Sequence, residues 1–168
     1  KRVRAADGLW TEIATNMPPL HYPVGGGCPS WLFEADAENV QIESQAFNLY
    51  TTTNIVVTTG QTPTAISGQT STKLTDDATN GLHRIFNTSV GSGVSRASIF
   101  AKKDTLTQIA LAESIGYANP AIFDLDLGTI ISDPYSNASI KDEGNGWYRC
   151  SILLTATGSD TVQIRTAK

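Results

Sequence analysis

The stretch DEGNGWYRCSILLTAT, residues 142–157, decides the fold class of this chain. Gly144, Asn145 and Gly146 form a turn signal, because glycine and asparagine accept the backbone conformations that tight turns require. We interpret the whole segment from Lys141 to Gly146 as turn chemistry. An aromatic, basic and aliphatic segment follows directly. It is typical of a late strand in a β-sandwich and not of an active site.

Side-chain alternation assigns the two faces of this strand, because successive residues of a strand point to opposite sides. The face expected to point to the core carries Tyr148, Cys150, Ile152 and Leu154. The face expected to point to solvent carries Trp147, Arg149, Ser151 and Leu153. A strand over residues 94–102 separates in the same way, and its solvent-facing set includes Phe100 and Lys102.

From residue 47 onward, threonine and β-branched residues alternate with glycine and asparagine at short intervals, which is typical of many short strands joined by turns. Strands are predicted over residues 54–58, 72–75, 82–90, 94–102, 106–116, 121–125, 128–132, 138–141, 147–157 and 161–166. The segment from Leu106 to Ile115 also fits a helical period, so a helix is the alternative there. The sequence thus predicts an all-β, jelly-roll-like two-sheet β-sandwich over residues 47–168.

An irregular extended N-terminal arm is predicted over residues 1–46. Pro18-Pro19, Pro23 and Pro29 exclude long helices from it. The arm has more apolar surface than a free tail exposes, contributed by Trp10, Trp31, Leu32 and Phe33. We therefore expect it to dock on a neighbouring subunit or domain. Because the chain begins at Lys1, we also expect it to be part of a longer polypeptide.

The composition of the chain argues against two classes of function, nucleic-acid binding and membrane insertion. Charged residues make up 17% of the 168 residues, and the formal net charge is −4. Without a basic stripe, nucleic acid is not an expected partner. No apolar run approaches the ~20 residues of a membrane span, so membrane insertion is not expected. Cys28 and Cys150 are far apart in sequence, and Cys150 fits a core position; a disulfide between them stays open.

Catalytic motifs are not apparent in the sequence. His21 and His83 are the only histidines, and no nucleophile elbow, zinc motif or phosphate loop occurs. The acidic pairs Asp76-Asp77, Asp124 with Asp126, and Asp142-Glu143 contain carboxylates of the kind that glycosidases use. Their Asn- and Gly-rich surroundings favour turn chemistry instead. We therefore predict no catalytic residues and no enzyme activity.

Three segments carry a resemblance to a known family: LTDDATNGLHRI at residues 74–85, FDLDLGTI at 123–130, and GNGWYRC at 144–150. Together they resemble the carbohydrate-binding-module-like domains of tailed-bacteriophage tail and fibre proteins, over about residues 34 to 157. The resemblance implies a non-enzymatic, lectin-like virion module that takes part in host recognition by binding glycans on the host surface. It also implies assembly in the host cytoplasm, other virion proteins as partners, and a homo-oligomer, with a trimer as the expected form.

The candidate glycan-binding residues are Trp147, Arg149, His83, Arg84 and Phe100. Aromatic rings stack on sugar faces, while guanidinium and imidazole groups bind hydroxyls. Each of these residues also has a purely structural interpretation. For Trp147, it is a tryptophan at the edge of the sandwich that covers the core. The segment SRASIF, residues 95–100, lacks the aromatic-rich strand of the family, so an aromatic platform is weakened.

Two functions other than host glycan binding remain open. One is a purely structural virion protein that cements or decorates capsid or tail subunits. The other is a substrate-holding module once joined to a lyase or glycosidase. No cofactor and no metal are expected. A structural calcium, which such sandwiches often carry, is the weaker alternative because no Asp-x-Asp-x-Asp-Gly loop occurs.

Overall fold

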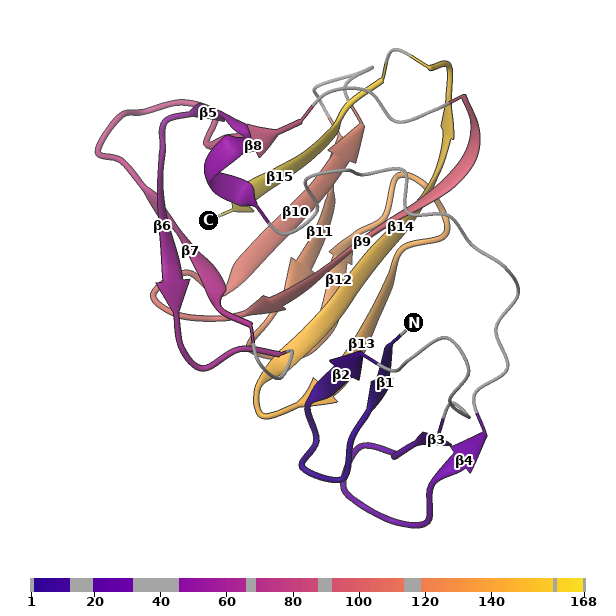
Figure 1. The fold of residues 1–168 in the computed structure, drawn as a ribbon. Helices are drawn as coiled ribbons and strands as arrows, with labels where there is room; N and C mark the ends of the chain where they lie inside the picture. Colours follow the sequence, from indigo (N-terminus) through magenta and orange to yellow (C-terminus); the bar gives the residue numbers. More distant parts are fainter. Residues whose placement is uncertain are drawn as a thin grey trace.

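The computed structural model describes residues 2–12, 20–31, 46–65, 69–87, 92–113, 119–158 and 160–167. Their regular structure is almost entirely β-strand, and the one short helical turn in these ranges is η1, Phe47–Leu49. The predicted all-β fold class is therefore confirmed. The chain forms a sandwich of two main sheets, with short hairpins added to it (Figure 1).

The larger sheet has six antiparallel strands in the order β12-β11-β10-β15-β8-β5. In chain order, its strands are β5 (Thr51–Thr53), β8 (Arg84–Phe86), β10 (Gln108–Glu113), β11 (Ala121–Asp124), β12 (Thr129–Ser132) and β15 (Val162–Ala167). Strand β12 forms one edge. The alternative of a helix from Leu106 is wrong, because Gln108–Glu113 pairs with strands on both sides.

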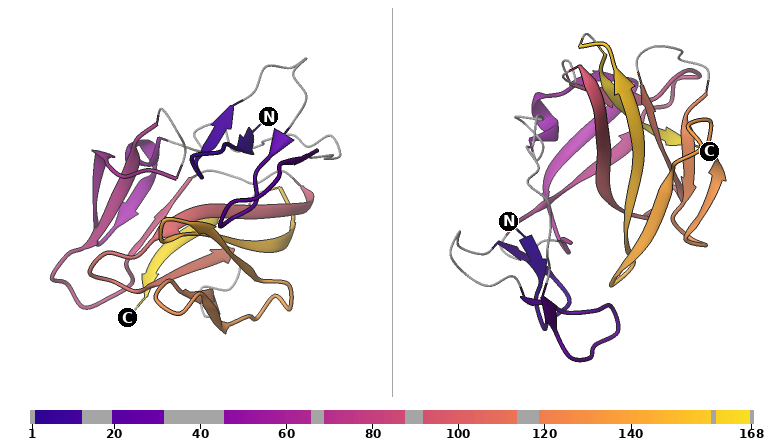
Figure 2. Two further views of the ribbon diagram at one scale, coloured as in Figure 1. Left: turned by 90° about the horizontal axis from the view of Figure 1, so that it is seen from below. Right: turned by 90° about the vertical axis from the view of Figure 1, so that its right-hand side faces the viewer.

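The smaller sheet has three antiparallel strands in the order β13-β14-β9. They are β9 (Gly93–Lys102), β13 (Ser139–Gly144) and β14 (Trp147–Ala156). The core lies between the sheets (Figure 2). Its buried side chains include Ile85, Leu111 and Phe123 from the larger sheet and Cys150, Ile152 and Leu154 from the smaller one. The predicted core-facing set of β14 is thus confirmed for these three residues.

A separate hairpin, formed by β6 (Ile55–Gln61) and β7 (Ser71–Asp76), lies beside the smaller sheet. Val57 and Leu74 pack against the common core. In the smaller sheet, β9 is hydrogen-bonded to β14 on one side only. The hairpin is a separate two-stranded sheet and does not join the hydrogen-bond ladder of β9.

Every strand predicted from residue 47 onward has a counterpart among the described residues. The parts of two predictions that fall on residues 88–90 and 114–116 lie outside the described ranges. The short strand β5 was not predicted. The turn assigned to residues 141–146 is wrong in extent, because β13 continues to Gly144 and only Asn145 and Gly146, both at positive φ, make the turn.

The described parts of the N-terminal region are two short hairpins. One pairs β1 (Arg2–Arg4) with β2 (Trp10–Glu12), and the other pairs β3 (Leu20–His21) with β4 (Ser30–Trp31). The β1–β2 hairpin packs near the β13–β14 turn (Figure 1). Trp10 is buried, so this part of the arm is covered by its own chain. Leu32 and Phe33 lie outside the described residues, and docking on a neighbour stays a prediction.

Candidate functional site

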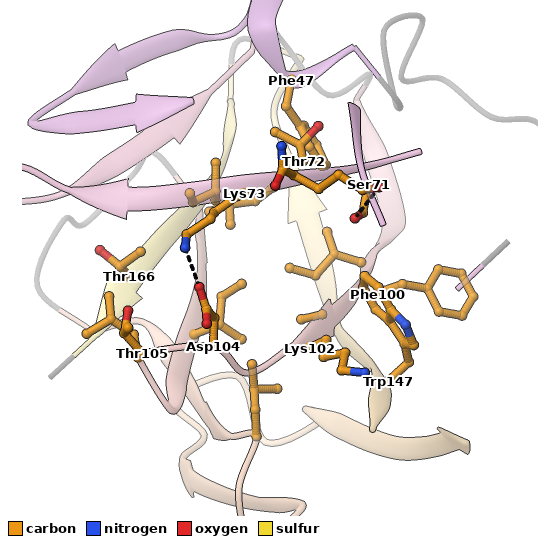
Figure 3. Close-up of a pocket in the computed structure, with 18 of the residues that line it drawn as sticks. Phe47, Ser71, Thr72, Lys73, Phe100, Lys102, Asp104, Thr105, Trp147 and Thr166 are labelled. Carbon is orange, nitrogen blue, oxygen red and sulfur yellow. Dashed lines mark hydrogen bonds and ion pairs between the residues drawn. The ribbon is translucent and has the colours of Figure 1, made fainter. Parts of the chain in front are cut away.

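A pocket of about 350 Å³ lies beside strand β9, on the side where β9 has no hydrogen-bonded neighbour (Figure 3). The β6–β7 hairpin forms the opposite wall. Apolar side chains that line it are Phe47, Leu74, Ile99, Ile109, Leu125 and Ile164. Several of these also belong to the sandwich core or pack against it. The pocket is therefore an opening between the layers where the core comes close to the surface.

Polar residues line the same pocket. They include Thr72, Lys73, Asp104, Thr105, Gln108 and Thr166. Lys73 Nζ and Asp104 Oδ2 form an ion pair of 2.5 Å across it. Thr166 Oγ1 donates a hydrogen bond to Asp76 Oδ1. Hydroxyl, amide, ammonium and carboxylate groups thus surround an apolar interior, which is the usual make-up of a small-molecule site.

Trp147 and Lys102 lie side by side at one end of the pocket, because they are direct partners across β14 and β9. Trp147 was expected to face solvent, but it is only 9% exposed. The expectation of an exposed stacking ring is therefore wrong, although the residue does line the pocket. Its Nε1 atom has no hydrogen-bond partner among the described residues.

Phe100 lines the pocket, but its ring points away from the centre (Figure 3). The ring lies 5.8 Å from the Trp10 ring, centroid to centroid. Arg149, its cross-strand partner on β14, does not line the pocket. The Arg149 guanidinium lies 6.0 Å from the Trp10 ring centroid, and its Nε is 3.3 Å from Glu143 Oε1. The β1–β2 hairpin therefore covers the sheet face that was expected to bind sugar.

Glu143 was missed by the sequence reasoning, which assigned it to a turn. Its side chain is 1% exposed and lies among three cationic groups. Arg4 bonds both its carboxylate and its backbone carbonyl. Arg149 and Lys141 approach the other carboxylate oxygen at 3.3 Å and 3.6 Å. Because Arg4 is 139 residues away in sequence, no local signal could have identified the pair.

His83 and Arg84 are at a different place from Trp147, since β8 belongs to the larger sheet and β14 to the smaller one. The structure therefore does not bring His83 and Arg84 together with Trp147 and Arg149 in one site, although all four were candidate glycan-binding residues. His83 is buried, and its Nδ1 lies 2.6 Å from the Asn54 carbonyl oxygen, so Nδ1 carries the proton. The Arg84 guanidinium lies 4.8 Å from the Phe86 ring centroid.

One carboxylate of each acidic pair considered for hydrolysis accepts local hydrogen bonds. Asp124 Oδ1 accepts from the backbone N–H groups of Asp126 and Leu127, and Asp142 Oδ1 accepts from that of Gly144. The Thr79 hydroxyl and backbone N–H lower the pKa of Asp77. Within the described ranges, no three His, Cys, Asp or Glu side chains are grouped to hold a metal ion.

The cysteines do not form a disulfide. Cys28 is an exposed free thiol, and Cys150 is a buried one, which answers the question that the sequence left open. Burial raises the pKa of Cys150 to about 12. Among the residues that the structure describes, no helix is long and apolar enough to cross a membrane.

No protein-family model matches this chain, and no curated protein sequence is significantly similar to it.

Proposed function

We propose that this chain is a non-enzymatic, glycan-binding module of a tailed-bacteriophage virion, in a tail, fibre or decoration protein. The virion assignment, with assembly in the host cytoplasm, rests on the resemblance of residues 74–85, 123–130 and 144–150 to such proteins. The glycan-binding assignment rests on the pocket between β9 and the β6–β7 hairpin. The ligand in this proposal is a sugar residue of a host-surface glycan.

The observation that carries this proposal is the make-up of the pocket. Its volume of about 350 Å³ is at the small end of the range for ligand sites, which suits one sugar residue rather than a large cofactor. The apolar interior fits the C–H face of a pyranose. Thr72, Thr105 and Gln108 supply hydroxyl and amide groups for the sugar hydroxyls. Of the five candidate residues, Trp147 and Phe100 line the pocket, although the Phe100 ring points away from its centre, and Arg149, His83 and Arg84 do not line it.

A binding role suits this pocket better than hydrolysis. Glycoside hydrolysis uses two carboxyl groups on either side of the scissile bond. The described lining holds one carboxylate, Asp104, and it is paired with Lys73. This supports the non-enzymatic proposal.

A purely structural virion role is the second candidate, and one observation favours it. Strand β12 is an edge of the larger sheet, and its Ile130 and Ile131 are 38% and 51% exposed. Leu127, in the preceding turn, is 73% exposed. An exposed apolar edge strand is a surface that pairs readily with another chain. In this alternative, β12 contacts another subunit and the pocket has no ligand.

The homo-oligomer proposal, with a trimer as the expected form, rests on the resemblance. The β1–β2 hairpin packs on its own sandwich, so its Trp10 does not supply a contact between subunits. Sedimentation analysis of the chain tests the oligomer. Replacing Ile131 with Lys then tests whether β12 forms the contact between subunits, because a charge buried in that contact would dissociate the oligomer.

A glycan array tests the function directly. The variant Thr72→Trp places an indole in the pocket, and Thr52→Trp makes the same change on an exposed position of β5 as a matched control. We expect the original chain and the control to bind the same glycans and Thr72→Trp to bind none. An array without any hits would favour the structural role. Binding by a folded Thr72→Trp protein would place the sugar site elsewhere.

A further inference from the structure

We propose that the pocket selects acidic glycans, with the Lys102 ammonium binding the carboxylate of a uronic or sialic acid residue. This inference rests on the proposed glycan-binding function and adds the class of sugar to it. It comes from the position of Lys102, from its fixed side chain and from the charges around it.

Lys102 ends strand β9 at the same end of the pocket as Trp147 (Figure 3). The ammonium donates a hydrogen bond of 2.8 Å to the Asn145 carbonyl oxygen in the β13–β14 turn. The side chain also runs close to Gly146, where an added Cβ atom would be 3.4 Å from Cε and 3.6 Å from Nζ. The absence of a side chain at Gly146 therefore leaves room for the lysine, and the turn holds its ammonium in place.

An ammonium group has three N–H donors and no acceptor. The Asn145 carbonyl takes one of them, which leaves two for a ligand. A carboxylate offers two oxygen atoms that accept only, and bonds between two charged groups are stronger than neutral ones. The Lys102 ammonium should therefore bind a carboxylate more tightly than a hydroxyl.

The charge balance of the pocket favours an anion. Its described lining contains the cations Lys73 and Lys102 and the anion Asp104. Lys73 and Asp104 neutralise each other. Among the described residues, no carboxylate lies within ion-pair distance of Lys102. One positive charge therefore stays uncompensated at the pocket.

Lys103 provides a matched comparison within the same chain. It is the next residue, it is also exposed, and it does not line the pocket. Its Nζ bonds Asp126 Oδ1, and this bond raises the pKa of the lysine. Removing Lys103 takes away the same formal charge within one residue of Lys102, but from a site that already has its anion.

Titrations with paired glycans test the inference. Each pair consists of an acidic oligosaccharide, containing uronic or sialic acid, and its neutral counterpart with the carboxyl group esterified. At about 0.05 M salt we expect the acidic member to bind about tenfold more tightly, the effect of one charge-assisted bond. At about 0.5 M salt the preference should shrink, because ions screen charges at a partly exposed site.

Three variants complete the design, and thermal unfolding confirms that each is folded. Lys102→Gln should lose the acidic preference and keep the binding of the neutral member. Lys102→Arg should retain most of the preference, and Lys103→Gln should retain all of it. The inference is overturned if neutral members bind as tightly as acidic ones, or if Lys102→Gln keeps the preference. If neither member of any pair binds, the proposed glycan-binding function itself fails.

Discussion

The guanidinium of Arg4 is buried against the carboxylate of Glu143, and both side chains are 1% exposed. Arg4 also donates to the Gly8 carbonyl oxygen at 3.0 Å, and its guanidinium lies 5.4 Å from the Trp10 ring centroid. These contacts join the N-terminal hairpin to strand β13, near the start of β14. The hairpin is therefore part of the folded domain, where it covers the outer face of the smaller sheet.

Replacing Arg4 with Met should destabilise the protein by about 3 kcal/mol, because a buried carboxylate would lose its main partner. Urea unfolding measures the change. Lys141→Met is the control: this lysine also approaches Glu143, but its side chain is 50% exposed, and such pairs contribute about 0–1 kcal/mol. Equal effects of the two variants would contradict a structural role for the buried pair.

Replacing both members of the pair should be less harmful than replacing one. In the double variant Arg4→Met with Glu143→Leu, no uncompensated charge remains in the interior. We expect it to be more stable than either single variant in the same urea experiment. Additive losses would show that Arg4 and Glu143 act independently.

The two thiols should differ sharply in reactivity, because the thiolate is the reactive form. Exposed Cys28 should react with a thiol reagent in the native protein at neutral pH, and Cys150 only after unfolding. Mass spectrometry of the labelled chain counts the modified residues. Modification of both cysteines under native conditions would contradict the burial of Cys150.

The raised pKa of Cys150 also predicts a loss of stability in alkaline solution. The unfolded thiol ionises near the ordinary value of 9.0, whereas the folded thiol stays protonated up to about 12. The contribution of the Cys150 thiol to the free energy of unfolding is thus fully present below pH 9.0 and is lost as the pH rises towards 12. The slope is at most about 1.4 kcal/mol per pH unit. Urea unfolding should show this extra slope in the original chain and not in Cys150→Ala.

Gly128 allows the close approach of Tyr148. It has a φ of +66°, and an added Cβ atom would lie 2.8 Å from Tyr148 Cε1. Gly60 has a similar φ of +74° but open space around it. We expect Gly60→Ala to lose about 1 kcal/mol from backbone strain alone. Gly128→Ala should lose about 2 kcal/mol or more, because the tyrosine must also move. Thermal unfolding compares the two, and equal losses would exclude the steric effect.

Local sequence signals predicted the strands well, because alternation and turn residues act over short distances. The Asn145-Gly146 turn and the inward set Cys150, Ile152 and Leu154 are examples. Strand β5 was missed because its residues, Thr51–Thr53, have no apolar alternation and pair only at the sheet edge.

The candidate site was predicted less well, because it depends on contacts between distant segments. Alternation placed Trp147 and Arg149 together on the face of β14 that was expected to point to solvent. It could not show that Trp10, from the N-terminal hairpin, packs over that face. Nor could it assign His83 and Trp147 to different sheets. The pocket residues on β7, such as Thr72 and Lys73, carry no motif that would have marked them.

The most direct measurement is NMR mapping of the glycan site, with the best-binding glycan titrated into isotopically labelled protein. If the pocket is the binding site, the backbone signals of Lys73, Lys102 and Thr105 should shift with saturation, while those of Arg84 and Arg149 stay unchanged. Saturable shifts confined to the surroundings of Arg84 or Arg149, with the pocket signals unchanged, would contradict the proposed site.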